Sequence, residues 1–101
     1  MLLELERRQA SITYVRTPSG KEVDFLARFP SGAAELIQVC ADATDVETAR
    51  RELTALAEAR SSHPRSVARL LVLTRDRLPA AVPAGVTAQP AYEWMLEGDT
   101  T

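Results

Sequence analysis

The stretch Val67–Thr74 places the strongest constraint on how this chain can fold. It reads VARLLVLT and is apolar almost throughout, with Arg69 as the main interruption. Such a run is typical of an interior strand that is covered on both faces, as in a parallel sheet between layers of helices. The sequence therefore predicts a sheet with other elements packed on both sides.

A helix is predicted directly before that strand. Thr44-Asp45-Val46-Glu47 has the form of a capping box, in which the Thr44 hydroxyl and the Glu47 carboxylate each accept a backbone N–H at the helix start. The apolar residues that follow recur at helical spacing, which predicts a buried stripe on a helix ending near Arg60. The stripe comprises Val46, Ala49, Leu53, Leu56 and Ala57. A helix between two strands predicts a right-handed crossover that makes those strands parallel.

Three strands are predicted before this helix, at Ser11–Thr17, Lys21–Phe29 and Ala34–Ala41. Turn signals at Thr17–Gly20 and Pro30–Gly32 join them, and turns this short predict an antiparallel meander. Within the second strand, simple alternation predicts two faces. Val23, Phe25, Ala27 and Phe29 would share one face, and Glu22, Asp24, Leu26 and Arg28 the other.

The two ends of the chain complete the predicted fold. Met1–Gln9 is rich in helix formers and resembles the end of a longer helix, so we expect the chain to be a piece of a larger protein. Val86–Gln89 predicts a short edge strand. Ala91–Glu97 predicts a helix with Pro90 at its first position, Gly98 past its end and Trp94 in the core.

These elements predict one mixed α/β domain over residues 1–97, with a loose tail over residues 98–101. In order, they are a helix, an antiparallel three-strand meander, a crossover helix, a parallel strand, a short edge strand and a final helix. A length of 101 residues fits a single domain.

Composition excludes several classes of function. The net charge of −2 provides no overall attraction to nucleic acid, so DNA binding would need a local basic patch. The single cysteine, Cys40, excludes an internal disulfide and a cysteine-rich zinc site. No charged leader precedes an apolar run, and no apolar run approaches the roughly 20 residues of a membrane helix. We therefore expect a cytoplasmic protein without membrane contact.

Three stretches together resemble a known family. They are Tyr14–Phe25 (YVRTPSGKEVDF), Glu35–Cys40 (ELIQVC) and Glu47–Leu53 (ETARREL). They resemble the C-terminal domain of a group of bacterial and archaeal AAA-type P-loop ATPases, a domain of the PD-(D/E)XK nuclease-like superfamily. The resemblance extends over residues 2–94 and implies a restriction-endonuclease-like core.

The resemblance also implies an ATPase module elsewhere in the full protein. This chain contains no G-x-x-x-x-G-K-[ST] run, so it has no ATP site of that kind. We expect it to be the nuclease-like part of a larger ATPase protein.

In active members of that superfamily, two acids on neighbouring strands bind Mg²⁺, and a lysine helps to position or activate water. Mg²⁺ favours carboxylate oxygens and lowers the pKa of the attacking water. By the resemblance, Asp24 matches the first acid and is the expected metal ligand, whereas Gln38 replaces the second acid and Cys40 replaces the lysine. We expect a degenerate site without a resident cofactor, with Mg²⁺ bound only if nuclease activity survives.

Other residues would compensate only if the fold brought them to the site. Glu6 would supply an acid, as the glutamate of the first helix does in some relatives. Glu35 has the opposite strand parity to Gln38 and is expected to face away. The simplest expectation for Glu6 and Glu35, as for Arg50 and Arg51, is a solvated surface charge. For Asp24 itself, a structural carboxylate paired with an arginine is the alternative to a site residue.

Basic residues near the expected site would contact phosphates if the domain binds DNA. They are Arg16, Lys21, Arg28, Arg50 and Arg51. Three functions therefore remain open. The chain is a catalytically degenerate domain that binds DNA or a protein partner for an attached ATPase, a weak Mg²⁺-dependent DNA endonuclease, or a structural domain whose sheet edge pairs with a copy of itself.

Overall fold

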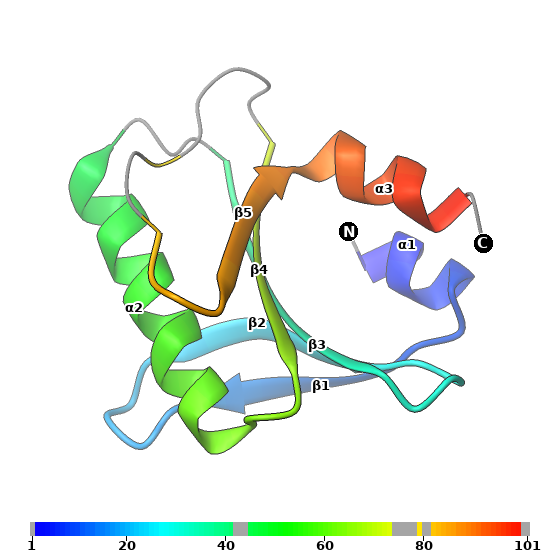
Figure 1. Ribbon diagram of the computed structural model, residues 1–101, viewed down its shortest axis with the longest axis horizontal. Helices are drawn as coiled ribbons and strands as arrows, with labels where there is room; N and C mark the ends of the chain where they lie inside the picture. Colours follow the sequence, from blue (N-terminus) through cyan, green and yellow to red (C-terminus); the bar gives the residue numbers. More distant parts are fainter. Residues whose placement is uncertain (1, 42–44, 74–78, 80–81, 100–101) are drawn as a thin grey trace.

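A single five-stranded sheet forms the centre of the molecule (Figure 1). The computed structural model describes residues 2–41, 45–73, 79 and 82–99. The elements in chain order are α1 (Leu2–Arg7), β1 (Ser11–Arg16), β2 (Glu22–Arg28), β3 (Ala34–Cys40), α2 (Val46–Ser62), β4 (Val67–Val72), β5 (Val86–Pro90) and α3 (Ala91–Asp99). Among these residues, no helix is long and apolar enough to cross a membrane.

The strands lie in the sheet in sequence order, β1-β2-β3-β4-β5. The β1–β2 and β2–β3 pairs are antiparallel, and the β3–β4 and β4–β5 pairs are parallel. The predicted meander and the predicted parallel neighbour across the helix are therefore confirmed, as is the mixed α/β class.

β4 is the buried interior strand that its composition predicts. Ala68, Leu70, Leu71 and Val72 have no exposed area. Leu70 and Val72 pack in the cluster that contains α2, whereas Leu71 packs in the cluster that contains α1 and α3. Because successive side chains of a strand point to opposite faces, α2 covers one face of the sheet, and α1 and α3 cover the other (Figure 1).

α2 begins one residue later than the capping box suggests. Its N-cap is Asp45, whose carboxylate accepts hydrogen bonds from the N–H groups of Glu47 and Thr48. The expected cap, Thr44, lies outside the described residues. The helix continues to Ser62, beyond the predicted end near Arg60.

The predicted apolar stripe of α2 is correct in its centre and wrong at its start. The buried residues of the helix are Ala49, Leu53, Ala55, Leu56 and Ala59. Val46 is 67% exposed, because it is the first residue of the helix and lies beyond the buried part of the stripe.

A β-bulge in β2 changes the predicted alternation. Thr13 pairs with Leu26 and Val15 pairs with Val23, so two residues of β2 lie opposite Tyr14. Val23 consequently joins Leu26 in the cluster under α2, whereas Phe25 and Ala27 belong to the opposite cluster. The prediction that Val23 shares a face with Phe25 is wrong, because an extra residue reverses the strand parity.

The C-terminal helix is longer than predicted. β5 extends through Pro90, and α3 runs through Gly98 to Asp99. A single glycine near a helix end costs only about 1 kcal/mol relative to alanine, so Gly98 does not stop the helix. The final residues of the predicted loose tail, 100–101, lie outside the described residues. Trp94 is 1% exposed, as its predicted core position requires.

α1 ends in a Schellman motif that contains a residue other than glycine. The N–H of Ala10 donates to the carbonyl of Leu5, and the N–H of Gln9 donates to the carbonyl of Glu6. Gln9 has a φ of 61°, in the left-handed region that favours glycine.

Replacing Gln9 with glycine is expected to stabilise the protein. The change removes the steric cost of the left-handed conformation and should raise the free energy of unfolding by about 0.5–1 kcal/mol. Urea denaturation followed by circular dichroism measures this change. Glu6→Gly, within the helix, is the control and should lower the free energy by about 1 kcal/mol. A loss of stability in both variants would contradict the prediction.

Candidate functional site

Asp24 and Gln38 meet where the ladder between β2 and β3 ends. The last main-chain pair of that ladder is Phe25 with Ile37. Beyond it, side chains supply the hydrogen bonds between the strands. The Asp24 N–H donates to Gln38 Oε1 over 2.7 Å, and the Val39 N–H donates to Asp24 Oδ2 over 3.0 Å. Asp24 therefore binds a backbone N–H of the next strand. Among the described residues it has no ion pair that would support the alternative of a structural carboxylate paired with an arginine.

The other end of the Gln38 side chain reaches α2. Its Nε2 donates a hydrogen bond to Glu52 Oε2. Gln38 is 6% exposed, and both ends of its amide have partners inside the fold. A buried amide with both ends satisfied holds two strands and a helix together.

Glu52 is a member of this cluster that the sequence-based prediction missed. Burial of its carboxyl, followed by the nearby Asp24 carboxylate, raises the pKa of Glu52, and Arg51 opposes that shift. A signal for Glu52 exists in the sequence. It follows Ala49 by three residues and immediately precedes Leu53, so it lies at the border of the buried stripe.

The other two predicted site residues lie apart from this pair. Cys40 is 4% exposed and packs under α2, on the same face as Gln38. Glu6 is exposed on α1, and α1 packs on the opposite face of the sheet. The structure thus brings together Asp24, Gln38 and Glu52, with Cys40 in the neighbouring apolar core.

This arrangement does not fit the Mg²⁺ site that the resemblance implies. The Gln38 amide is engaged at both ends, and Asp24 Oδ2 already accepts a backbone N–H. Within the described part of the chain, no three His, Cys, Asp or Glu side chains are grouped to hold a metal ion.

Glu35 faces away from Gln38, as its strand parity predicts, but it is not a solvated charge. Glu35 Oε1 accepts hydrogen bonds from Arg69 Nε over 2.7 Å and from Trp94 Nε1 over 3.4 Å. Arg69 Nη1 also donates to Gln89 Oε1 over 2.7 Å. The arginine that interrupts the apolar strand β4 is therefore neutralised on the face of α1 and α3.

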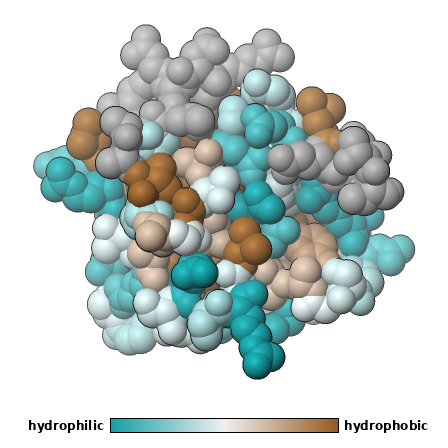
Figure 2. Space-filling model, in the orientation of Figure 1, coloured by the Kyte–Doolittle hydropathy of each residue, from teal (hydrophilic) through white to brown (hydrophobic). Residues whose placement is uncertain are grey.

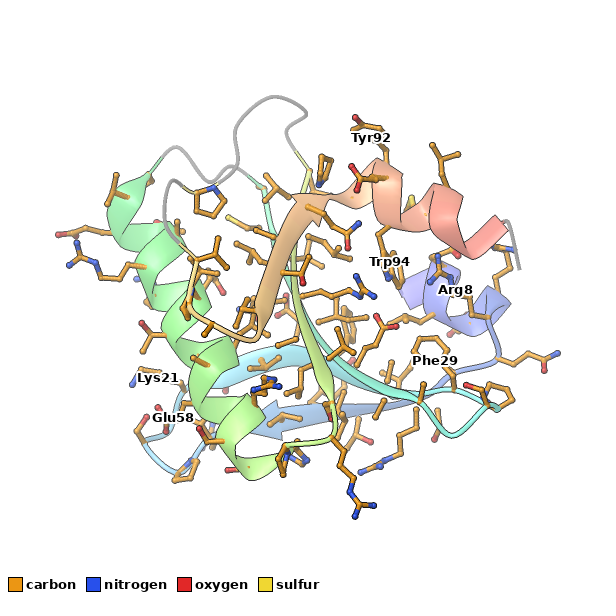
Figure 3. The ribbon with its side chains drawn as sticks, in the orientation of Figure 1. Arg8, Lys21, Phe29, Glu58, Tyr92 and Trp94 are labelled. Carbon is orange, nitrogen blue, oxygen red and sulfur yellow. The ribbon has the colours of Figure 1, made fainter. Side chains whose placement is uncertain are left out.

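Arg8 links α1 to α3 beside this network. Its guanidinium carbon lies 3.9 Å from the ring centroid of Trp94, and its Nη2 donates to the Trp94 carbonyl over 2.7 Å (Figure 3). A cation over an indole contributes about 0.5–2 kcal/mol. The contact holds the short α1 against α3.

Two of the five predicted phosphate-binding residues are already paired with acids. Arg16 contacts Glu22 over 3.0 Å, and Lys21 Nζ lies 3.5 Å from Glu58 Oε2. The remaining three are exposed and have no ion pair among the described residues. They are Arg28, Arg50 and Arg51.

Glu58 fastens the turn between β1 and β2 to α2. The backbone N–H and the hydroxyl of Ser19 donate to its two carboxylate oxygens over 2.8 and 2.7 Å, and Lys21 approaches the same carboxylate (Figure 3). The hydrogen bonds from Ser19 lower the pKa of Glu58 to about 2. The Thr17–Lys21 segment of the family-like stretch therefore has a structural use.

Glu52→Gln is expected to stabilise the protein at neutral pH. Because the folded state raises the pKa of Glu52, ionisation of this carboxyl opposes folding above that pKa. The amide removes that penalty and still offers Gln38 an acceptor. The gain in unfolding free energy should be largest at pH 7–8 and should shrink as the pH falls toward 4.5, the ordinary value. Urea titrations across this range measure it, and a gain that does not depend on pH would contradict the assignment.

Glu58→Gln is expected to have the opposite effect. The lowered pKa means that the ionised carboxylate stabilises the fold at pH values above 4.5, and this contribution is lost as the pH falls from 4.5 to about 2. The variant should be less stable than the wild type at pH 7 and should lose less stability in that acid window. Acid denaturation followed by circular dichroism tests this. Glu6→Gln, at an exposed site, is the control and should follow the wild type.

Comparisons of the chain with family models, with curated proteins and with solved structures find no match.

Proposed function

We propose that this chain is a catalytically degenerate, nuclease-like domain that binds a protein partner. The observation that supports the proposal most is the state of Gln38. The residue at the position of the second metal-binding acid is a neutral, buried amide that joins Asp24, on the neighbouring strand, to Glu52 on α2. A residue used in this way is part of the scaffold.

The arrangement of strands agrees with a restriction-endonuclease-like core. An antiparallel meander leads through a helix to parallel strands, which is the order that the sequence resemblance implies. By the resemblance, Asp24 corresponds to the first acid of such a core. Its carboxylate closes the end of a strand ladder by accepting the Val39 N–H.

By the resemblance, Cys40 takes the place of the active-site lysine. Cys40 is buried among apolar residues, and a thiol cannot supply an ammonium group to position water. Arg51 on α2 acts on the cluster by lowering the pKa of Glu52, but its side chain is exposed. These features support the proposal that the domain lacks nuclease activity.

Surface charge favours a protein partner over DNA. Phosphate binding gains free energy when cations on the protein replace counterions on the nucleic acid. Arg16 and Lys21 are paired with acids, and the chain has a net charge of −2. In the view of Figure 2, hydrophobic residues form small groups among hydrophilic ones, as is usual at protein surfaces. By the resemblance, the partner we infer is a P-loop ATPase module.

Cation binding tests the degenerate site. Isothermal titration with Mn²⁺ is expected to show no binding to the wild type, whereas Gln38→Glu should create binding by placing a third carboxylate beside Asp24 and Glu52. Gln89→Glu is the matched control, because Gln89 is also buried, at 5% exposure, but lies on the other face. Manganese binding by the wild type, or Mg²⁺-dependent cleavage of a DNA duplex, would overturn the proposal.

Fluorescence anisotropy with a labelled DNA duplex decides between the two classes of partner. We expect no binding at 50 mM salt, where phosphate contacts are strongest. Binding that weakens steeply between about 50 and 200 mM salt would show that the partner is DNA.

A further inference from the structure

Among the described residues, the strand β1 is one edge of the sheet, since β2 is its one neighbour in the strand order (Figure 1). Within the same part of the chain, the six residues of β1, Ser11–Arg16, pair along one side. An exposed edge presents unpaired N–H and C=O groups that can accept another strand. The opposite edge, β5, is shorter and ends in Pro90, which cannot donate to a further strand.

The hydrogen-bond pattern shows which groups of β1 point outward. The Thr17 N–H donates inward to the Lys21 carbonyl over 2.7 Å, at the end of the β1–β2 pair. Because backbone groups alternate along an antiparallel strand, the N–H and C=O groups of Ile12, Tyr14 and Arg16 point away from β2. The bulge does not disturb this alternation, since its extra residue is in β2.

β1 has few of the features that protect edge strands from pairing. It contains no proline and no lysine, and its one charged residue, Arg16, is paired with Glu22. At its centre, the Tyr14 side chain is 73% exposed, and its ring lies 6.1 Å from that of Phe25 on the neighbouring strand. A large, exposed aromatic in the middle of an unprotected edge indicates a contact surface.

We propose that β1 pairs in antiparallel fashion with β1 of a second copy of this chain, joining the two sheets into one. A two-fold axis perpendicular to the sheet brings the outward groups of Tyr14 opposite those of Tyr14 in the second copy. The same axis places Ile12 opposite Arg16, whose outward groups also match. This register favours a second copy as the occupant. Each residue whose N–H and C=O groups point outward then lies opposite another such residue, and no two arginines are opposed.

The pairing also extends an aromatic contact that already exists. A perpendicular two-fold axis keeps the two faces of the joined sheet distinct, so the two Tyr14 rings lie on the same side. Each ring remains beside the Phe25 of its own chain. Cross-strand aromatic pairs of this kind stabilise a sheet. The dimer does not depend on the nature of the partner proposed above, since the Gln38 cluster lies at the junction of β2, β3 and α2.

Sedimentation velocity over a concentration series tests the dimer. The wild type should shift from a mass of 11.1 kDa toward twice that value as its concentration rises to about 1 mM. Tyr14→Lys should remain monomeric throughout, because a charge at the two-fold axis opposes its own copy. Tyr92→Lys is the control, since Tyr92 is also exposed, at 46%, but lies on α3, and it should associate like the wild type.

Amide hydrogen exchange gives a second readout. The Tyr14 N–H should exchange more slowly at concentrations where the wild type is dimeric. A wild type that is monomeric at every concentration would overturn the proposal, as would a Tyr14→Lys variant that associates equally well. Circular dichroism of each variant tests whether the fold is retained. We expect that it is, because both tyrosines are exposed.

Discussion

Burial of β4 on both faces is the constraint on which the rest of the structure depends. An apolar strand in the interior of a sheet needs cover on each side. α2 supplies it on one side, and α1 with α3 supplies it on the other. β3 lies beside β4, so alternate side chains of β3 also point into two separate interiors, one under α2 and one under α1 and α3. Gln38 and Cys40 therefore face α2, whereas Glu35 faces α3.

The two polar clusters described above, one under α3 and one under α2, are held together by different means. Under α3, Arg69 and Glu35 neutralise each other, with Gln89 and Trp94 as further partners. Under α2, the Gln38 amide connects the Asp24 backbone to Glu52. Arg69 and Glu35 can form an ion pair because they lie on adjacent strands, β4 and β3. In the second interior, burial of the Glu52 carboxyl, followed by the nearby Asp24 carboxylate, raises the pKa of Glu52.

The family-like stretch Tyr14–Phe25 has a structural explanation in nearly every part. Ser19 and Lys21 fasten the turn to Glu58, and Asp24 closes the ladder between β2 and β3. Tyr14 is the exception, since its side chain is largely exposed, with its ring near that of Phe25.

Sequence by itself determined the mixed α/β class, the meander, the parallel strand after α2 and the core position of Trp94. Those features follow from local periodicity and turn chemistry, which act over a few residues. Only the tertiary structure decided the bulge in β2, the partner of Asp24 and the membership of Glu52 in the site. The bulge depends on how β1 and β2 align, and a single extra residue reversed the predicted face of Val23. Glu52 reaches Gln38 only because α2 packs across β3, and contact between residues that far apart in the chain is set by packing, which no local pattern encodes.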